Sequence, residues 1–214
     1  MNRPYLHPPA LRIWHWLNAA IVMALIATGL DLRFHGIAAL APRDPALLWH
    51  KGLGLALIAV SIFWFVYSVA SGNLRRHYGI KRGDLRGMAA QTRYYLGAIF
   101  TGGANPFPGT PAAKFNPLQK IAYNAVMFIL LPIQAVTGLL FMNIPPLRDW
   151  LLAGELIGLL GAAHTLCSYL LILYLIVHLY MATLGETFFA HTRAMITGYE
   201  DAAQPPGQEE GNRT

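Results

Sequence analysis

The sequence predicts an all-α integral membrane protein whose transmembrane part is a bundle of four helices. Its 214 residues are 55% apolar and only 12% charged, with a mean hydropathy of +0.41, which is too apolar for an ordinary soluble domain. The apolar residues also gather in four long stretches, and each has about the 20 residues that a helix needs to cross a bilayer. We therefore expect one membrane domain over residues 1–200.

The four expected spans are residues 13–32, 48–70, 121–142 and 163–185. In the third span, Pro132 should kink the helix, because proline has no N–H to donate and its ring crowds the preceding turn. The aromatic residues of 91–101 favour a short helix at the membrane surface. Residues 201–214 are polar and contain Pro and Gly, so we expect a disordered tail.

Basic residues gather on one side of this expected topology. The connection between the second and third spans holds eight of them against the single acid Asp84: Arg75, Arg76, Lys81, Arg82, Arg86, Arg93, Lys114 and Lys120. The positive-inside rule then predicts that this connection and both termini lie in the cytoplasm. The net charge of +6 follows from that topology and does not indicate nucleic-acid binding. Anionic membrane lipid or a docked protein are both suitable neighbours for this basic segment.

Cysteine usage and the N-terminus exclude other classes. The single cysteine, Cys167, can build neither a disulfide framework nor a thiolate metal site within this chain. The first residues lack the short apolar run and small-residue cleavage site of a signal peptide, so we expect the first span to be retained.

Two histidines in the fourth span suggest a metal-containing cofactor. His164 and His178 are fourteen residues apart in an otherwise almost wholly apolar stretch. In a helix this spacing advances about 21 Å and returns within roughly 40° of the same face. Ionisable residues inside a span are expensive and usually functional, and imidazole is a common axial ligand of haem iron. One helix thus offers ligands at two membrane depths, which favours two stacked haems.

Two further histidines match these depths in the expected topology. His15 lies near the inner start of the first span, level with His178, and His50 lies at the outer start of the second span, level with His164. Antiparallel helices of a bundle can therefore supply two axial pairs. We expect His15 and His178 to bind an inner haem iron, and His50 and His164 an outer one.

These histidines also fit two roles that involve no haem. Each one alone is equally compatible with a hydrogen bond to a backbone carbonyl. A haem-free transporter or anchor would also use buried histidines, although zinc wants three or four ligands at one point and these form two groups. Arg12, Arg33 and Lys51 lie within a few residues of the proposed haem levels and are candidate partners for haem propionates.

A short internal echo links the first and third spans. Residues 27–30 read Ala-Thr-Gly-Leu and residues 136–139 read Val-Thr-Gly-Leu, near the outer end of each span. Small residues there allow close helix contact or the approach of a flat ligand.

Three motifs together resemble a known family: Leu-Arg-Ile-Trp-His-Trp-Leu-Asn at 11–18, the histidine pair of the fourth span, and Lys-Phe-Asn-Pro-Leu-Gln-Lys at 114–120. The chain resembles the dihaem cytochrome b subunits of the thiosulfate reductase and formate dehydrogenase gamma type, to which nickel-iron hydrogenase cytochrome b subunits are related. The resemblance covers roughly residues 5–200.

The resemblance implies a subunit of the bacterial inner membrane that exchanges electrons between quinone, menaquinone or ubiquinone, and an iron-sulfur partner subunit. That partner would connect to a molybdenum or tungsten catalytic subunit. It also implies a quinone site beside the inner haem, near Lys114, Asn116 and Gln119. A plainer interpretation makes Asn116 the N-cap of the third span, followed by Pro117 in the first turn, and the two roles are compatible. A conduit between soluble donors, without quinone, is the other alternative that keeps the haems.

Overall fold

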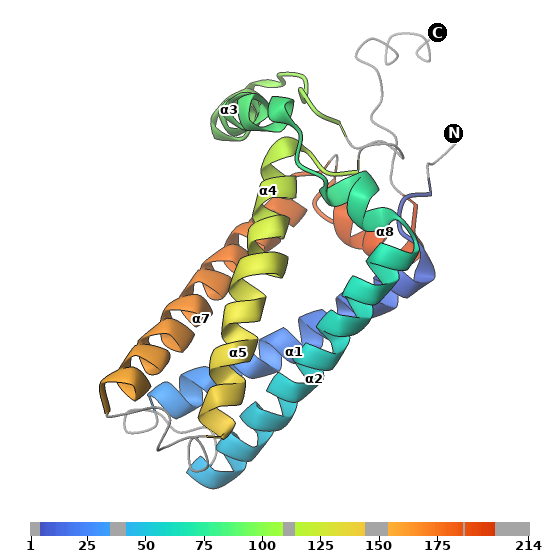
Figure 1. Cartoon of the computed structure of the whole chain (residues 1–214). Coiled ribbons are helices and arrows are strands. Elements are labelled where there is room, and N and C mark those ends of the chain that lie inside the picture. The colour runs from blue at the N-terminus through green and yellow to red at the C-terminus, as the bar shows by residue number, and fades with distance from the viewer. Residues whose placement is uncertain (1–4, 35–41, 109–113, 144–153, 186, 200–214) are drawn as a thin grey trace, which may run out of the picture.

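The computed structural model describes residues 5–34, 42–108, 114–143, 154–185 and 187–199. Four long helical segments form the body of the protein (Figure 1). They are α1 (Pro9–Arg33), α2 (Arg43–Ala70), the continuous helix Pro117–Met142, and α7 (Gly154–Ala182). Each segment is long and apolar enough to cross a membrane. The predicted all-α membrane fold is therefore confirmed.

Each helix begins before its apolar run does. The segments start at Pro9, Arg43, Pro117 and Gly154. The spans expected from the apolar runs start later, at residues 13, 48, 121 and 163. Hydropathy detects only the part of a helix that lies in hydrocarbon, whereas proline at the first helical turn starts α1 and the third segment earlier. The tail predicted at 201–214 lies outside the described residues.

The third segment contains a π-helical turn where the sequence predicts a kink. It consists of α4 (Pro117–Ala125), the π-helical η3 (Val126–Leu130) and α5 (Leu131–Met142). Pro132 lies just after η3. A proline ring crowds the carbonyl four residues earlier, here that of Phe128, and the wider π turn absorbs this conflict. The helix thereby accommodates Pro132 without ending.

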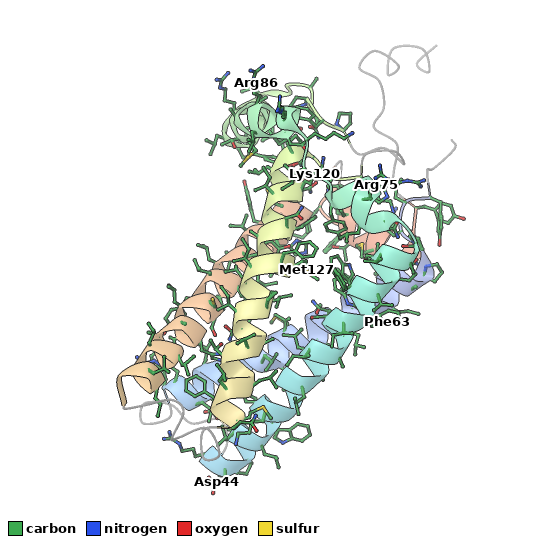
Figure 2. The ribbon with its side chains drawn as sticks, viewed as in Figure 1. Asp44, Phe63, Arg75, Arg86, Lys120 and Met127 are labelled. Atoms are coloured by element: carbon green, nitrogen blue, oxygen red, sulfur yellow. The ribbon has the colours of Figure 1, made fainter. Side chains whose placement is uncertain are left out.

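One end of the bundle collects the start of α1, the helix α8 (Ala190–Thr197) and the described parts of the long connection between α2 and α4 (Figure 1). The connection includes η1 (Leu74–Tyr78), α3 (Arg82–Leu96) and the 3-10 turn η2 (Ala98–Thr101). The surface helix predicted at 91–101 thus begins earlier and is interrupted at Gly97. In Figure 2, Arg75, Arg86 and Lys120 lie at this end and Asp44 at the opposite one. We call these the basic end and the far end.

The N-terminal and C-terminal parts of the chain are joined at the basic end. Backbone N–H groups of Leu6 and His7 donate to the carbonyl of Gly198, which comes directly after α8 (Ala190–Thr197). Gly198 has φ of +91°, and a Cβ there would lie 2.6 Å from the Tyr5 ring. The Trp16 indole also donates to the carbonyl of Met195. These contacts fix the start of α1 and so the position of His15.

Candidate functional site

Two pairs of histidines face each other inside the bundle at two levels. The ring centres of His15 on α1 and His178 on α7 are 6.2 Å apart. Those of His50 on α2 and His164 on α7 are 6.4 Å apart. We call His15 and His178 the inner pair, because they lie toward the basic end, and His50 and His164 the outer pair. The structure thus brings together the same partners that the sequence paired by depth.

The outer pair is surrounded by hydrogen-bonding side chains. The hydroxyl of Thr28 lies 2.9 Å from His50 Nδ1, and that of Thr137 lies 2.9 Å from His164 Nδ1. The Gln134 amide contacts His164 Nε2 at 3.0 Å and the Ser168 hydroxyl at 2.8 Å. Thr28 lies on α1, which packs against α2, the helix of His50. Thr137 and Gln134 lie on α5, which packs against α7, the helix of His164 and Ser168.

The glycines of the internal echo allow these contacts. A Cβ on Gly29 would lie 3.2 Å from His50 Cε1, and one on Gly138 would lie 3.5 Å from His164 Cε1. Any larger side chain at Gly29 would push the His50 ring away. The repeated Thr-Gly-Leu segment therefore approaches one histidine ring in each half of the chain, His50 through Gly29 and His164 through Gly138.

The inner pair has aromatic neighbours instead. The Tyr174 ring stacks on His178 with centres 5.8 Å apart, one turn earlier on α7. The Trp16 ring meets His15 edge-on at 5.1 Å. The Tyr174 ring also contacts the Tyr123 ring, which in turn contacts the Phe115 ring. A row of aromatic rings therefore extends from His178 to the basic end.

Both pairs fit a metal held between two imidazoles. A metal–nitrogen bond of about 2.0 Å on each side places the centres of two trans imidazole rings roughly 6 Å apart, which agrees with 6.2 and 6.4 Å. The Gln134 amide donates to His164 Nε2, so a metal on this nitrogen requires the amide to turn away toward Ser168. Among the described residues no three His, Cys, Asp or Glu side chains converge as a metal cluster. The arrangement suits a cofactor metal with two protein ligands better than a bare zinc ion.

Comparison with known proteins agrees with this geometry. A model of the family described as prokaryotic cytochrome b561 matches residues 6–198, which is nearly the whole chain. The chain belongs to the prokaryotic cytochrome b561 family. It is therefore a multi-pass bacterial membrane protein that carries b-type haem, and a haem-free transporter or anchor is set aside.

One relative of this cytochrome is a protein of Escherichia coli (strain K12) named "Putative cytochrome YdhU". It is 36% identical over 203 residues, which is 91% of this chain and 74% of the relative. The match is to the cytochrome family as a whole, and the narrower thiosulfate reductase and formate dehydrogenase type stays a prediction.

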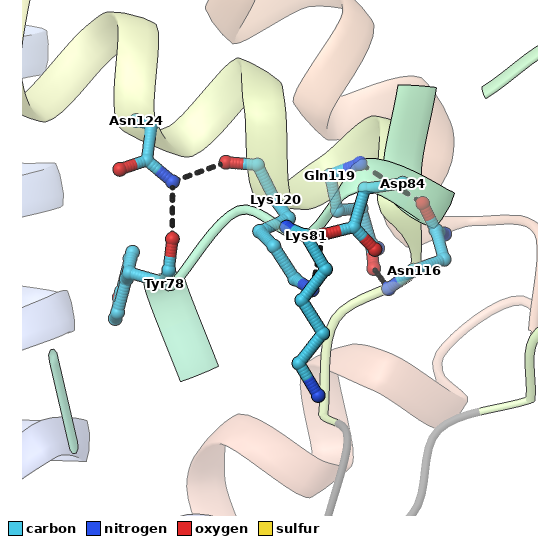
Figure 3. Close-up of polar contacts among 7 residues, drawn as sticks. All are labelled: Tyr78, Lys81, Asp84, Asn116, Gln119, Lys120 and Asn124. Carbon is cyan, nitrogen blue, oxygen red and sulfur yellow. Dashed lines mark hydrogen bonds and ion pairs between the residues drawn. The ribbon is translucent and has the colours of Figure 1, made fainter. Parts of the chain in front are cut away.

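Two of the three residues named for a quinone site, Asn116 and Gln119, form a helix cap (Figure 3). Asn116 Oδ1 accepts from the backbone N–H of Gln119 at 2.9 Å, and Gln119 Oε1 accepts from the backbone N–H of Asn116 at 3.2 Å. Asn116 Nδ2 donates to the Tyr95 hydroxyl at 2.8 Å, which ties α4 to α3. The structure thus shows the capping role in full, and a contact with quinone stays a prediction.

Lys114 lies beside a small cavity at the basic end. Its ammonium donates to the carbonyl of Leu6, and burial together with the nearby Arg76 charge lowers its pKa. The cavity, about 20 Å³, is also lined by His77, Tyr78 and Phe115, and this volume suits one water molecule rather than a quinone ring. His77 is 6% exposed, and burial, with the charges of Lys114 and Arg76, lowers its pKa to about 4.

A larger apolar groove lies toward the basic end of α1 and α2. It has a volume of about 470 Å³ and runs between α1 and α2, lined by Ile13, Trp14 and Leu17 on one side and Val60 and Phe63 on the other. These α1 residues flank His15 in the sequence, but neither His15 nor His178 lines the groove, and the helical rotation turns the His15 side chain toward another face of α1. Such a volume is within the range of small-molecule sites, roughly 300–1,000 Å³.

The three candidate propionate partners lie at different places. Arg12 donates to the carbonyl of Ile196 and so belongs to the junction of the N-terminal and C-terminal parts. The Arg33 guanidinium lies over the Phe34 ring at 5.5 Å, and Lys51 comes directly after His50 on α2. Their assignment to propionates stays a prediction.

Sequence reasoning did not assign a role to Thr28, Thr137, Gln134 or Tyr174. The echo drew attention to small residues, while the useful signal was a hydroxyl at the same place in each copy. Tyr174 stands four residues before His178, which is the spacing that brings side chains together on a helix. Gln134 had no comparable signal.

Proposed function

We propose that this cytochrome is a dihaem electron-transfer subunit that anchors an oxidoreductase complex in the bacterial inner membrane. His15 and His178 hold the inner iron, and His50 and His164 hold the outer one. One observation carries the proposal: two histidine pairs have nearly the same ring spacing, 6.2 and 6.4 Å, at levels that fourteen residues of helix separate by about 21 Å. Two redox centres at that separation connect the two sides of a bilayer.

A haem held by two imidazoles would supply reversible one-electron chemistry. The chain's own residues orient the imidazoles, keep water away from them and set the local polarity. Four apolar helices surround both levels, and the apolar surroundings control the redox potential.

Quinone exchanges electrons at the inner pair in this proposal, with menaquinone and ubiquinone both suitable. The apolar groove between α1 and α2 supports this, because it offers a hydrophobic ring a place on the helix that carries His15. Lys114, Asn116 and Gln119 stand at the membrane edge of the same end and would bind the carbonyl oxygens. With both termini in the cytoplasm, the protons of quinone turnover would be exchanged with that compartment.

An iron-sulfur subunit, and through it a molybdenum or tungsten catalytic subunit, is the proposed partner. One cysteine in the whole sequence leaves no iron-sulfur ligand set in this chain, and no nucleotide-binding glycine loop accompanies the helices. Substrate chemistry is therefore assigned to another protein, and identification of proteins that co-purify with this cytochrome tests the assignment directly.

Quinol-driven reduction of the haems tests the quinone step. Asn116→Ser keeps a good N-cap but lacks the amide, whereas Asn116→Ala loses both. We expect rapid haem reduction by a short-chain quinol in the wild type, slower reduction in Asn116→Ser, and unchanged reduction of each variant by dithionite. Equal quinol rates in wild type and Asn116→Ser would limit Asn116 to capping.

A transmembrane conduit without quinone is the second candidate. One observation favours it: the polar groups of Asn116 are engaged with Gln119 and Tyr95. A wild-type protein whose haems are reduced by a soluble donor but never by quinol would establish this alternative.

A further inference from the structure

Thr28 and Thr137 contact the outer pair in the same way from opposite halves of the chain. Each hydroxyl lies 2.9 Å from the Nδ1 atom of one histidine. Each threonine precedes the glycine that approaches the same ring, Gly29 toward His50 and Gly138 toward His164. The same contact is therefore made twice by two different helix pairs.

The direction of these hydrogen bonds is set by the second contact of each hydroxyl. Thr28 donates to the carbonyl of Ala24 at 2.8 Å, and Thr137 donates to the carbonyl of Ile133 at 2.7 Å. A hydroxyl has one hydrogen, so toward the histidine it must accept. Nδ1 of His50 and of His164 therefore carries the proton, and Nε2 carries the free lone pair. The amide N–H of Gln134 donates to His164 Nε2, which agrees with a lone pair on that nitrogen.

The inner pair lacks this arrangement. His15 Nδ1 is buried and makes no hydrogen bond with any described residue. Its ring and that of His178 are held by the aromatic neighbours Trp16 and Tyr174. The two levels thus present imidazoles of unequal electronic character to whatever they bind.

We propose that Thr28 and Thr137 are positioning residues that fix the tautomer and raise the basicity of the outer axial ligands. The inference rests on the proposed function, because it requires a haem between His50 and His164. An acceptor on Nδ1–H pushes electron density toward Nε2. This favours the ferric over the ferrous state and lowers the potential of the outer haem alone.

Replacing each threonine by valine tests the proposal, because valine has a similar shape and no hydroxyl. The measurements use a His178→Ala background, so that the outer haem is observed alone. We expect Thr28→Val and Thr137→Val each to raise the ratio of ferrous to ferric haem at a fixed ambient potential. A tenfold change would equal about 59 mV for one electron. The g-values of the ferric haem in electron paramagnetic resonance should shift as well.

Serine variants and a distant threonine complete the experiment. Thr28→Ser and Thr137→Ser retain the hydroxyl and should restore the wild-type potential. Thr183→Val removes an exposed hydroxyl that donates to the carbonyl of Tyr180 and should change nothing. Loss of the outer haem in the valine variants, with retention in the serine variants, also supports the proposal.

Two results would overturn distinct claims. The role of the threonines is contradicted if the outer haem keeps its potential and g-values in both valine variants. It is also contradicted if the serine variants lose the outer haem as the valine variants do. Absence of any haem from the His178→Ala parent, whose threonines are native, contradicts the proposed function instead.

Discussion

We expect His77 to make the basic end sensitive to acid. Its pKa lies at about 4 in the folded protein, because of burial first and of Lys114 and Arg76 second, against 6.5 in an unfolded chain. As pH falls, the unfolded chain therefore binds this proton before the folded one does. The contribution of neutral His77 to the free energy of unfolding is fully present above about pH 6.5 and is lost as the pH falls toward about 4.

We expect the unfolding temperature of the purified cytochrome to fall between about pH 7 and about pH 5, and His77→Gln to reduce that fall. Thermal unfolding followed by circular dichroism at both pH values measures it. His191→Gln, which removes a histidine on α8, is the matched control. An equal loss of stability in wild type and His77→Gln would assign the acid sensitivity to other groups.

The roles of some single residues could be predicted from the sequence, and those of others could not. The depth of a histidine can be predicted because helix rise and antiparallel order are regular. The hydroxyls of Thr28 and Thr137 could not be assigned, since their role depends on which neighbouring helix they face. The Lys114 contact with Leu6 joins residues far apart in the sequence and had no local signal.

At the scale of elements, α7 sets the distance between the two levels. It carries both His164 and His178, whereas their partners come from two different helices, α1 and α2. Each additional residue in a helix adds about 1.5 Å and rotates the remainder of the helix by about 100°. The haem-binding geometry therefore depends on the number of residues between these histidines.

One alanine inserted between Leu171 and Ile172 should turn His178 away from His15 and leave the outer pair intact. We expect this variant to bind about half the wild-type haem, measured as pyridine haemochrome per protein chain. The same insertion between Leu156 and Ile157 keeps the interval unchanged and should keep both haems. Full haem content in the first variant would show that His178 is dispensable.

Helix boundaries were less predictable than helix existence. Apolar runs gave the four spans, but polar helix ends and the π turn of Val126–Leu130 carry no hydropathy signal. On α3, Asp84 accepts from the backbone N–H of Lys81 at 2.7 Å and pairs with Lys120 at 2.9 Å. The pKa of Asp84 is lowered because these contacts outweigh the effect of burial, the largest single contribution, which raises it. The ion pair between Asp84 and Lys120 holds α3 against α4. The sequence alone did not predict this contact.

At the scale of the whole molecule, the distribution of charge predicts the orientation in the membrane. The basic end carries the start of α1, α3 and α8 (Figure 1), and basic residues favour the cytoplasmic side. We expect alkaline phosphatase fused to the C-terminus to be inactive in cells, and a green fluorescent protein fused there to fluoresce. A fusion after Phe34 should show the reverse behaviour. Phosphatase activity at the C-terminus would invert the proposed orientation.

The haem content of the purified membrane protein and its histidine variants shows whether four histidines hold two haems. We expect two b-type haems per chain, one in His178→Ala, one in His50→Ala and none in the double variant, with reduced-minus-oxidised spectra of b type wherever haem remains. A wild-type protein with a single haem, or a His178→Ala variant that keeps two, would contradict the pairing of four histidines on two irons.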